Sequence, residues 1–205
     1  MRDKWHGDNR DLVKWGVLLE LANRYQARHI LQVLYQRSST WERLEIDGEQ
    51  VELPAAVVQH FRNAASVSAM QCSARVEVVS ETFGDRSDYL QIVLQRIRLR
   101  KEFPGIVFLD PDTGLTPRFA KPEHVLESEL AEIWETLGPK DIMVFYQHKT
   151  NRSSIPWIEP KKAQFERALC VREGRAKLAS APGIAPDVAF FYIEKNSDED
   201  ASIPA

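Results

Sequence analysis

Hydrophobic and polar positions along the chain switch between helical and strand periods, which predicts helices and strands in turn. Helices are predicted over residues 11–25, 54–65, 89–101, 123–137 and 159–170. Strands are predicted over residues 29–35, 75–79, 106–110, 142–146 and 188–193. The turn Asp47-Gly48 indicates a small hairpin between the first strand and the second helix.

The ends of two helices carry clear sequence markers. Asp8 and Asp85 each follow a glycine and precede a helical pattern, so both are predicted N-caps. The first helix, over residues 11–25, has one strongly apolar stripe. We expect its buried face to consist of Leu12, Trp15, Leu18, Leu19 and Ala22.

The alternation of strands and helices predicts an α/β fold. The run Ile106-Val-Phe-Leu is continuously apolar, as is typical of a strand inside a parallel sheet. Because parallel strands need crossover connections, we expect a three-layer, doubly wound, mostly parallel sheet of the Rossmann-like kind. Residues 1–195 are expected to form a single domain, and residues 196–205 a flexible acidic tail.

Composition agrees with a globular protein. Of the 205 residues, 43% are hydrophobic and 28% are charged, which argues against a disordered or fibrous chain. No apolar run approaches the length of a membrane span and the N-terminus is charged, so we expect a cytoplasmic protein without membrane contact. The two cysteines lie far apart, which disfavours a disulfide framework or a zinc site.

The net charge of −3 provides no global attraction for nucleic acid, but basic residues concentrate in one stretch. The segment from Lys149 to Lys177 contains eight basic and three acidic residues. Such runs are more often solvated helix faces than phosphate-binding surfaces, although a nucleic-acid partner is a second possibility for this segment.

Candidate chemistry gathers where two predicted strands end, because ligands of open α/β sheets bind at the carboxyl ends of strands. The first strand end is Asp110-Pro-Asp112. Its two carboxylates could bind a divalent cation such as Mg²⁺, or hold an amino group or a ribose hydroxyl of a ligand. Asx-type turn bonds that shape the loop are the structural alternative.

The second strand end, residues 146–157, is rich in donors. His148 is a candidate acid or base, and Lys149 or Arg152 could balance Asp110 and Asp112 while binding a phosphate or carboxylate. Trp157 is a candidate stacking platform. The candidate catalytic residues are Asp110, Asp112, His148 and Lys149, and the candidate substrate-binding residues are Tyr146, Asn151, Arg152 and Trp157.

Several well-known motifs are absent. The sequence has no phosphate-binding loop of the Gly-x-x-x-x-Gly-Lys-Ser/Thr type, no Gly-x-Gly-x-x-Gly after the first strand, no Gly-x-Ser-x-Gly and no His-Glu-x-x-His. These absences lower the rank of nucleoside triphosphatases, standard dinucleotide enzymes, serine-elbow hydrolases and zinc proteases.

Three features occur in an order that is similar to two known families. They are Gly7-Asp-Asn-Arg-Asp-Leu-Val-Lys-Trp15, Phe108-Leu-Asp-Pro111 and Val144-Phe-Tyr146. The chain thus resembles adenine-N6 methyltransferases of ribosomal RNA and three-Cys-motif partner proteins. The resemblance implies a Rossmann-like sheet, S-adenosylmethionine, and a target amino group held by Asp110. Of the family motif, Asp110 and Pro111 are the residues that match. The candidate cofactor-binding residues are Lys14, Tyr35 and Pro111. The first strand ends with Leu34-Tyr-Gln-Arg37, where the family has a glycine-rich turn.

Two other function classes fit the same residues. Asp110 and Asp112, together with Gln147-His-Lys149, are similar to the elements of metal-dependent nucleases or phosphodiesterases, in which carboxylates hold Mg²⁺ and a lysine orients the attacking water. The third class is a non-catalytic interaction module with a methyltransferase-like fold.

Overall fold

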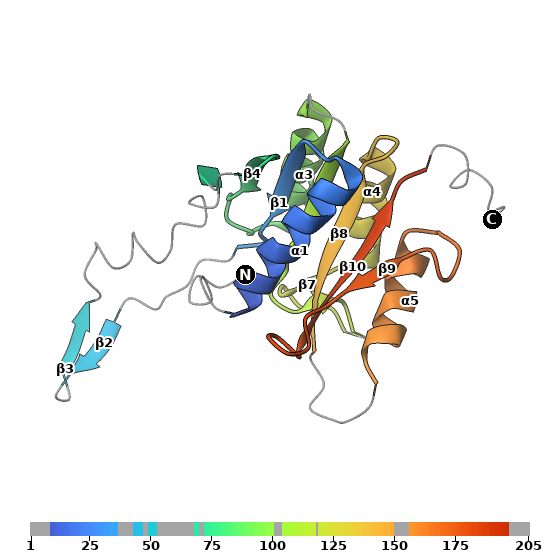
Figure 1. Cartoon of the computed structure of the whole chain (residues 1–205). Helices are drawn as coiled ribbons and strands as arrows, with labels where there is room; N and C mark the ends of the chain where they lie inside the picture. The colour runs from blue at the N-terminus through green and yellow to red at the C-terminus, as the bar shows by residue number, and fades with distance from the viewer. Residues whose placement is uncertain are drawn as a thin grey trace.

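The structure of the chain is a computed structural model, and it describes residues 9–36, 43–46, 49–52, 68–69, 72–100, 104–117, 119–149 and 156–196. Its centre is a six-stranded sheet with the strand order β4-β1-β5-β8-β10-β9 (Figure 1). The strands are β1 (His29–Val33), β4 (Arg75–Val79), β5 (Gly105–Leu109), β8 (Ile142–His148), β9 (Lys177–Ala179) and β10 (Val188–Glu194).

Four of these strands run parallel. The strand β1 pairs with both β4 and β5, and β5 pairs with β8, all in parallel. The strand β10 is antiparallel to its two neighbours, β8 and β9. The predicted α/β class and the mostly parallel sheet are therefore confirmed.

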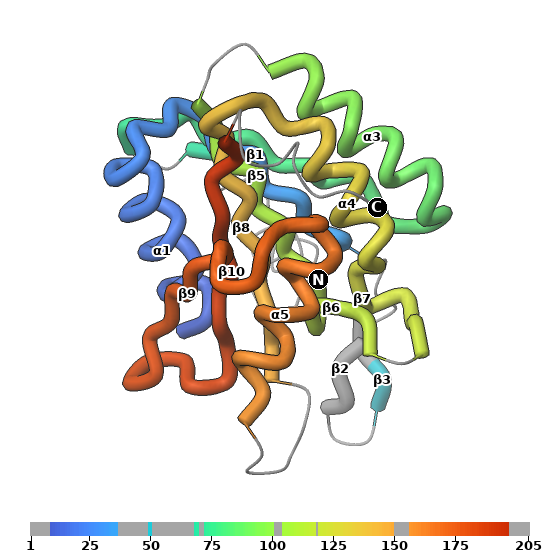
Figure 2. Tube along the Cα trace, turned by 90° about the vertical axis from the view of Figure 1, so that its right-hand side faces the viewer, coloured from blue at the N-terminus to red at the C-terminus, as the bar shows by residue number. Residues whose placement is uncertain are grey.

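Helices cover both faces of the sheet. They are α1 (Asn9–Tyr25), α3 (Arg86–Leu99), α4 (Glu127–Thr136) and α5 (Ile158–Ala168). Figure 2 shows α1 on one side of the sheet and α3 and α4 on the other. Leu18 and Leu21 of α1 pack with Phe108 of β5, whereas Phe165 of α5 packs with Phe145 on the opposite face. The helix α1 thus stands alone, among the described elements, on the face that it covers.

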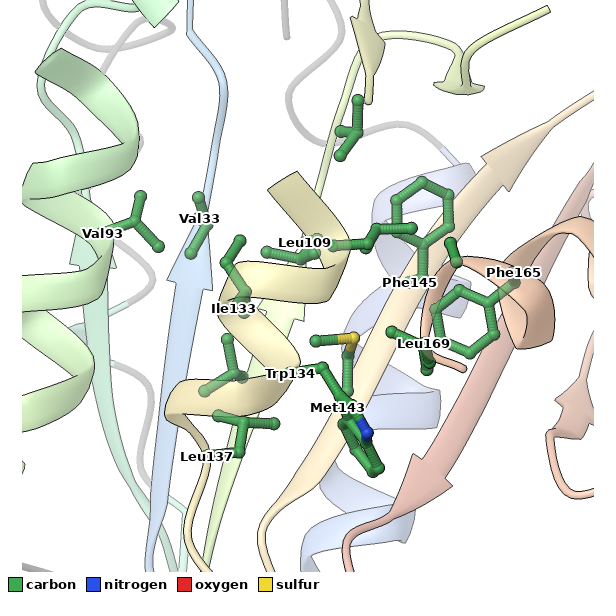
Figure 3. Close-up of a cluster of buried hydrophobic side chains, with 14 of the residues drawn as sticks. Val33, Val93, Leu109, Ile133, Trp134, Leu137, Met143, Phe145, Phe165 and Leu169 are labelled. Atoms are coloured by element: carbon green, nitrogen blue, oxygen red, sulfur yellow. The ribbon is translucent and has the colours of Figure 1, made fainter. Parts of the chain in front are cut away.

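The largest hydrophobic cluster of the described residues lies on the face of α3, α4 and α5. Figure 3 shows Leu109, Met143 and Phe145 of the sheet against Ile133 and other side chains of the covering helices. Inner strands such as β5 are buried along their whole length, because both faces of the sheet are covered. This rigid layer fixes the positions of the strand ends.

The structure corrects the predicted face of the first helix. Leu12 is 65% exposed, whereas Lys14 is 3% exposed and belongs to the buried face with Val13, Leu18 and Leu21. The prediction that Leu12 is buried used the apolar stripe of the helix alone. The helix is rotated instead so that Lys14 reaches a carboxylate at the edge of the sheet.

The structure also corrects the start of the helix predicted over residues 123–137. His124 and Val125 form the short strand β7 (His124–Val125), which pairs with β6 (Gly114–Leu115). The helix α4 begins only at Glu127. The backbone of the loop after β5 finds its partners in β7, and this tertiary pairing overrides the local helical pattern.

Other local predictions had mixed outcomes. The Asp85 N-cap is confirmed, since its side chain accepts a hydrogen bond from the Asp88 N–H at 3.0 Å. The predicted hairpin is confirmed as β2 (Arg43–Ile46) paired with β3 (Glu49–Glu52). The short strands β6, β7 and β9 were not predicted. The Asp8 cap, the helix over 54–65 and the tail from residue 197 onward lie outside the described residues.

Candidate functional site

The order of the strands reverses around β1, and this reversal locates the candidate site. The chain runs from β1 to β4 on one side and then returns to β5 on the other side of β1. In open α/β sheets, ligands bind outside the carboxyl ends of strands at such a switch point. The side chains at the carboxyl ends of β1 and β5, covered by the N-terminal half of α1, therefore form the candidate site.

Asp110 is the central side chain of this site. Its Oδ2 atom accepts a hydrogen bond from Gln32 Nε2 at 2.8 Å and lies 2.9 Å from Lys14 Nζ. The residue is only 1% exposed. Within the described part of the chain both contacts use Oδ2, which leaves Oδ1 as a second acceptor. Asp110 is thus a buried carboxylate with one oxygen engaged.

Gln32 supplies another acceptor in the same place. A carboxylate can only accept hydrogen bonds, so the Gln32 amide must turn its NH₂ group toward Asp110. Its Oε1 atom then points away from Asp110, and this buried oxygen has no hydrogen-bond partner among the described residues. A buried acceptor without a partner costs about 1–3 kcal/mol, so such an atom is a natural position for a ligand donor.

Lys14 has an unusually complete set of contacts. Its ammonium lies 2.8 Å from Asp11 Oδ1 and 5.4 Å from the centre of the Tyr146 ring, in addition to the contact with Asp110. Burial lowers the pKa of Lys14, but the charges of Asp110 and Asp11 more than offset this effect, and the pKa is raised. Lys14 is therefore a charged binding group rather than a base or nucleophile at neutral pH.

A second polar cluster lies one helical turn away on α1. Arg10 and Asp187 form an ion pair in which both the Arg10 Nε and Nη2 atoms donate to the carboxylate. His148 Nε2 lies 3.1 Å from the same Asp187 carboxylate. Burial raises the pKa of Asp187, yet the hydrogen bond and charge of Arg10 and the charge of His148 outweigh it, and the pKa is lowered.

A cavity of about 660 Å³ borders this second cluster. It is lined by Asn9, Arg10, Ile184, Ala185, Pro186 and Asp187. Arg10 and Lys14 are four residues apart on α1 and share one face of the helix. The two clusters thus form one polar strip along the carboxyl edge of the sheet, from β1 to β10.

The end of β1 is filled with aromatic side chains. Tyr35 is buried, and its ring centre lies 5.6 Å from that of Phe83 and 5.3 Å from that of Tyr89. Tyr89 also accepts a hydrogen bond from the Tyr35 N–H at 3.1 Å. The φ angle of Tyr35 is 47°, a conformation that favours glycine. The turn after β1 therefore has a glycine-like backbone but carries a large side chain.

The loop after β5 is held by Gln147, which points to the opposite face from Asp110. Its Oε1 accepts from the Leu115 N–H at 2.9 Å, and its Nε2 donates to the Thr113 carbonyl at 3.1 Å. Gly114, with φ at 120°, leaves room for this amide. Gln147 therefore positions the loop instead of facing Asp110.

The remaining predicted residues lie in different surroundings. Pro111 is buried, whereas Asp112 and Lys149 are half-buried, and the Lys149 N–H donates to the Asp187 carbonyl at 2.8 Å. Trp157 packs against the core on the α5 face, away from α1. Asn151 and Arg152 lie outside the described residues. The structure brings Lys14, Asp110, Tyr146 and His148 to one face.

The basic residues of the 149–177 segment do not share one surface role. Lys161 donates to the Leu115 carbonyl at 3.1 Å, and burial lowers its pKa. Arg175 donates to the Glu194 carbonyl at 3.2 Å. Arg167 and Arg172 are exposed. Part of this basic stretch is thus used to hold α5 and β10 in place.

Metal-ligating side chains do not cluster in the part of the chain that the structure describes. No group of three or more His, Cys, Asp or Glu residues is arranged there to hold a metal ion. The Asp110 carboxylate is instead paired with Lys14. Among the same residues, no helix is long and apolar enough to cross a bilayer.

Four side chains that make the polar contacts described above were missed from the sequence: Arg10, Asp11, Gln32 and Asp187. Within the strand β1, Gln32 is the only polar side chain between Ile30 and Val33. A single polar residue in an apolar run could have indicated from the sequence that this side chain belongs to a site. Asp187 precedes the last strand and lies 177 residues from Arg10, so no local pattern connects the two.

Comparison with known proteins assigns no family to this chain, because neither a protein-family model nor a curated protein matches it.

Proposed function

We propose that this chain is a Rossmann-like protein, related to adenine-N6 methyltransferases, that binds the amino group of a nucleobase at the carboxyl ends of β1 and β5. The mostly parallel sheet with helices on both faces supports a doubly wound, three-layer arrangement. The position of Asp110-Pro111 at the switch point supports the relation to these methyltransferases.

The unpartnered Gln32 Oε1 beside the Asp110 carboxylate is the observation that carries this proposal. The amino group of a nucleobase has two hydrogens, and it is best bound by two acceptors. Gln32 Oε1 and Asp110 Oδ1 supply two acceptors on side chains that are already hydrogen-bonded to each other. Asp110 has the same role in the family resemblance, which implies a target amino group held by this residue.

The residues at the end of β1 do not fit S-adenosylmethionine. The glycine-rich turn of the resembled family allows the methionine part of the cofactor to approach the backbone. In this chain the corresponding turn carries Tyr35, which packs against Phe83 and Tyr89. The proposed function is therefore binding of an amino-bearing base, and no methyl-transfer step is derived. No specific observation favours the metal-dependent nuclease.

Calorimetric titration of the purified chain with adenosine and with purine riboside, which lacks the amino group, tests this proposal. We expect adenosine to bind at least about 10-fold more tightly than purine riboside. This ratio of affinities corresponds to the loss of one hydrogen bond to a charged group. Asp110→Asn should remove most of this difference. Asp88→Asn, an exposed aspartate on α3, is the matched control.

Equal affinity for the two nucleosides, or no binding of either, would contradict the proposed function. A parallel titration with S-adenosylmethionine checks the cofactor separately. If that compound binds more tightly than adenosine and Tyr35→Gly strengthens its binding further, the turn after β1 accommodates the cofactor and our conclusion on its fit is wrong.

A further inference from the structure

We infer that Lys14 closes the amino-group site by pairing with Asp110 Oδ2, and that the first turns of α1 form a strap that must open before a ligand can reach Asp110. This inference rests on the proposed function for the identity of the ligand. The strap is defined as residues 9–14, the described part of α1 that ends at Lys14.

The first argument is the chemistry around the Lys14 ammonium. Two carboxylates, Asp11 and Asp110, lie within 2.9 Å of Nζ, and the Tyr146 ring is 5.4 Å away. Paired acceptors beside an aromatic face are the surroundings that recognise a ligand ammonium or amino group. The Lys14 side chain therefore occupies the kind of site that the Asp110 end of β5 offers to a ligand.

The second argument is access. The Lys14 side chain is 4% exposed and that of Asp110 is 1% exposed. Gln32 Oε1 is also buried. Because Lys14 reaches Asp110 Oδ2 from α1, a ligand donor contacts the two remaining acceptors, Asp110 Oδ1 and Gln32 Oε1, only after the strap has moved and this ion pair has opened.

The third argument is how α1 is anchored. Leu18, Leu21 and Ala22 in the second half of the helix are at most 3% exposed and pack into the sheet. Within residues 9–13, Val13 is 5% exposed, and Arg10 pairs with Asp187 near the outer end of the strap. The two side chains of this pair are 34% and 32% exposed. Such accessible pairs contribute little, so the first turns can open while the second half stays packed.

Asp187→Asn tests the strap without changing the Asp110 site. The substitution weakens the outer pair, and we expect Lys14 to be acylated by an amine-reactive reagent about two- to fivefold faster than in the wild-type chain. Amide hydrogen exchange over residues 9–17 should accelerate by a similar factor. The matched control is Glu20→Gln, which weakens the exposed Glu20–Arg24 pair in the second half of the same helix.

Exchange of the α3 amides must stay unchanged, which shows that the chain has not unfolded as a whole. If Asp187→Asn labels Lys14 no faster than Glu20→Gln does, the strap does not exist. This readout uses no ligand, so it remains decisive when the wild-type chain fails to bind adenosine.

When adenosine does bind, Asp187→Asn should tighten its apparent affinity by the same two- to fivefold factor, because more of the protein is open. Unchanged affinity together with faster labelling would show that Lys14 does not compete with the ligand.

Discussion

At the scale of single residues, the ion pair between Lys14 and Asp110 is the main energetic feature of the candidate site. Both side chains are almost completely buried, and each has a further polar partner, Asp11 and Gln32 respectively. Removing two charges from water is costly, and the mutual attraction of the pair is needed to compensate for it. Loss of one partner should therefore be far worse than loss of both charges.

We expect Lys14→Met to lower the free energy of unfolding by about 3–5 kcal/mol, because it leaves the Asp110 charge buried without its counter-charge. The double variant Lys14→Met with Asp110→Asn should recover a large part of this loss. Urea denaturation monitored by circular dichroism measures both. If the double variant is as unstable as Lys14→Met alone, packing of the lysine stem, not the charge, is what matters.

At the scale of elements, the loop between β5 and β7 depends on close contact between Gly114 and Gln147. A Cβ atom at Gly114 would lie about 2.4–2.5 Å from the amide atoms of Gln147. The Gln147 side chain is buried and is held by three hydrogen bonds, so it cannot move aside easily. The backbone of Gly114 is also in a conformation that side chains rarely adopt.

Gly114→Ala should therefore lower the free energy of unfolding by about 2–4 kcal/mol. Gly84→Ala is the matched control, since no atom lies within 4 Å of its added Cβ, and it should change stability by less than about 1 kcal/mol. Thermal unfolding of the two variants side by side measures the difference. Equal stability would mean that the loop rearranges freely around Gln147.

The hydrophobic pattern of the sequence predicted the long buried strands but missed the short strand β7 and the exposed position of Leu12. Continuously apolar runs such as Ile106 to Leu109 were predicted as strands, because burial on both faces leaves a clear signature. The strand β7 was missed because two residues carry no period, and its existence depends on the pairing with Gly114 and Leu115. The exposed position of Leu12 was missed because the apolar stripe contains no information about the partner of Lys14.

At the scale of the whole molecule, the two ends of the sheet have separate polar centres. The site lies at the carboxyl end, whereas Asp141 joins elements at the opposite end. Its carboxylate accepts from Arg100 Nη2 at 2.7 Å and from the Gly105 and Gly138 N–H groups, each at 2.9 Å. Asp141 is fully buried, so it fastens the end of α3 to the starts of β5 and β8.

We expect Asp141→Ala to lower the free energy of unfolding by about 3–5 kcal/mol, because it leaves the Arg100 charge buried without its partner. The affinity of the folded protein for adenosine should not change, because the substitution lies at the far end of the strands. Urea denaturation and calorimetry at low temperature measure the two quantities. A loss of affinity without a loss of stability would show that the two ends are coupled.

The sequence by itself determined the class of the fold, the main strands and the position of Asp110 at the end of a buried strand, since burial and strand ends leave local patterns. Only the tertiary structure decided which side chains meet Asp110. Gln32 and Lys14 lie 78 and 96 residues away from it, and their contacts depend on the order of the strands and the rotation of α1. Local periodicity reports how a residue is buried, but it carries no information about which distant charge lies beside it.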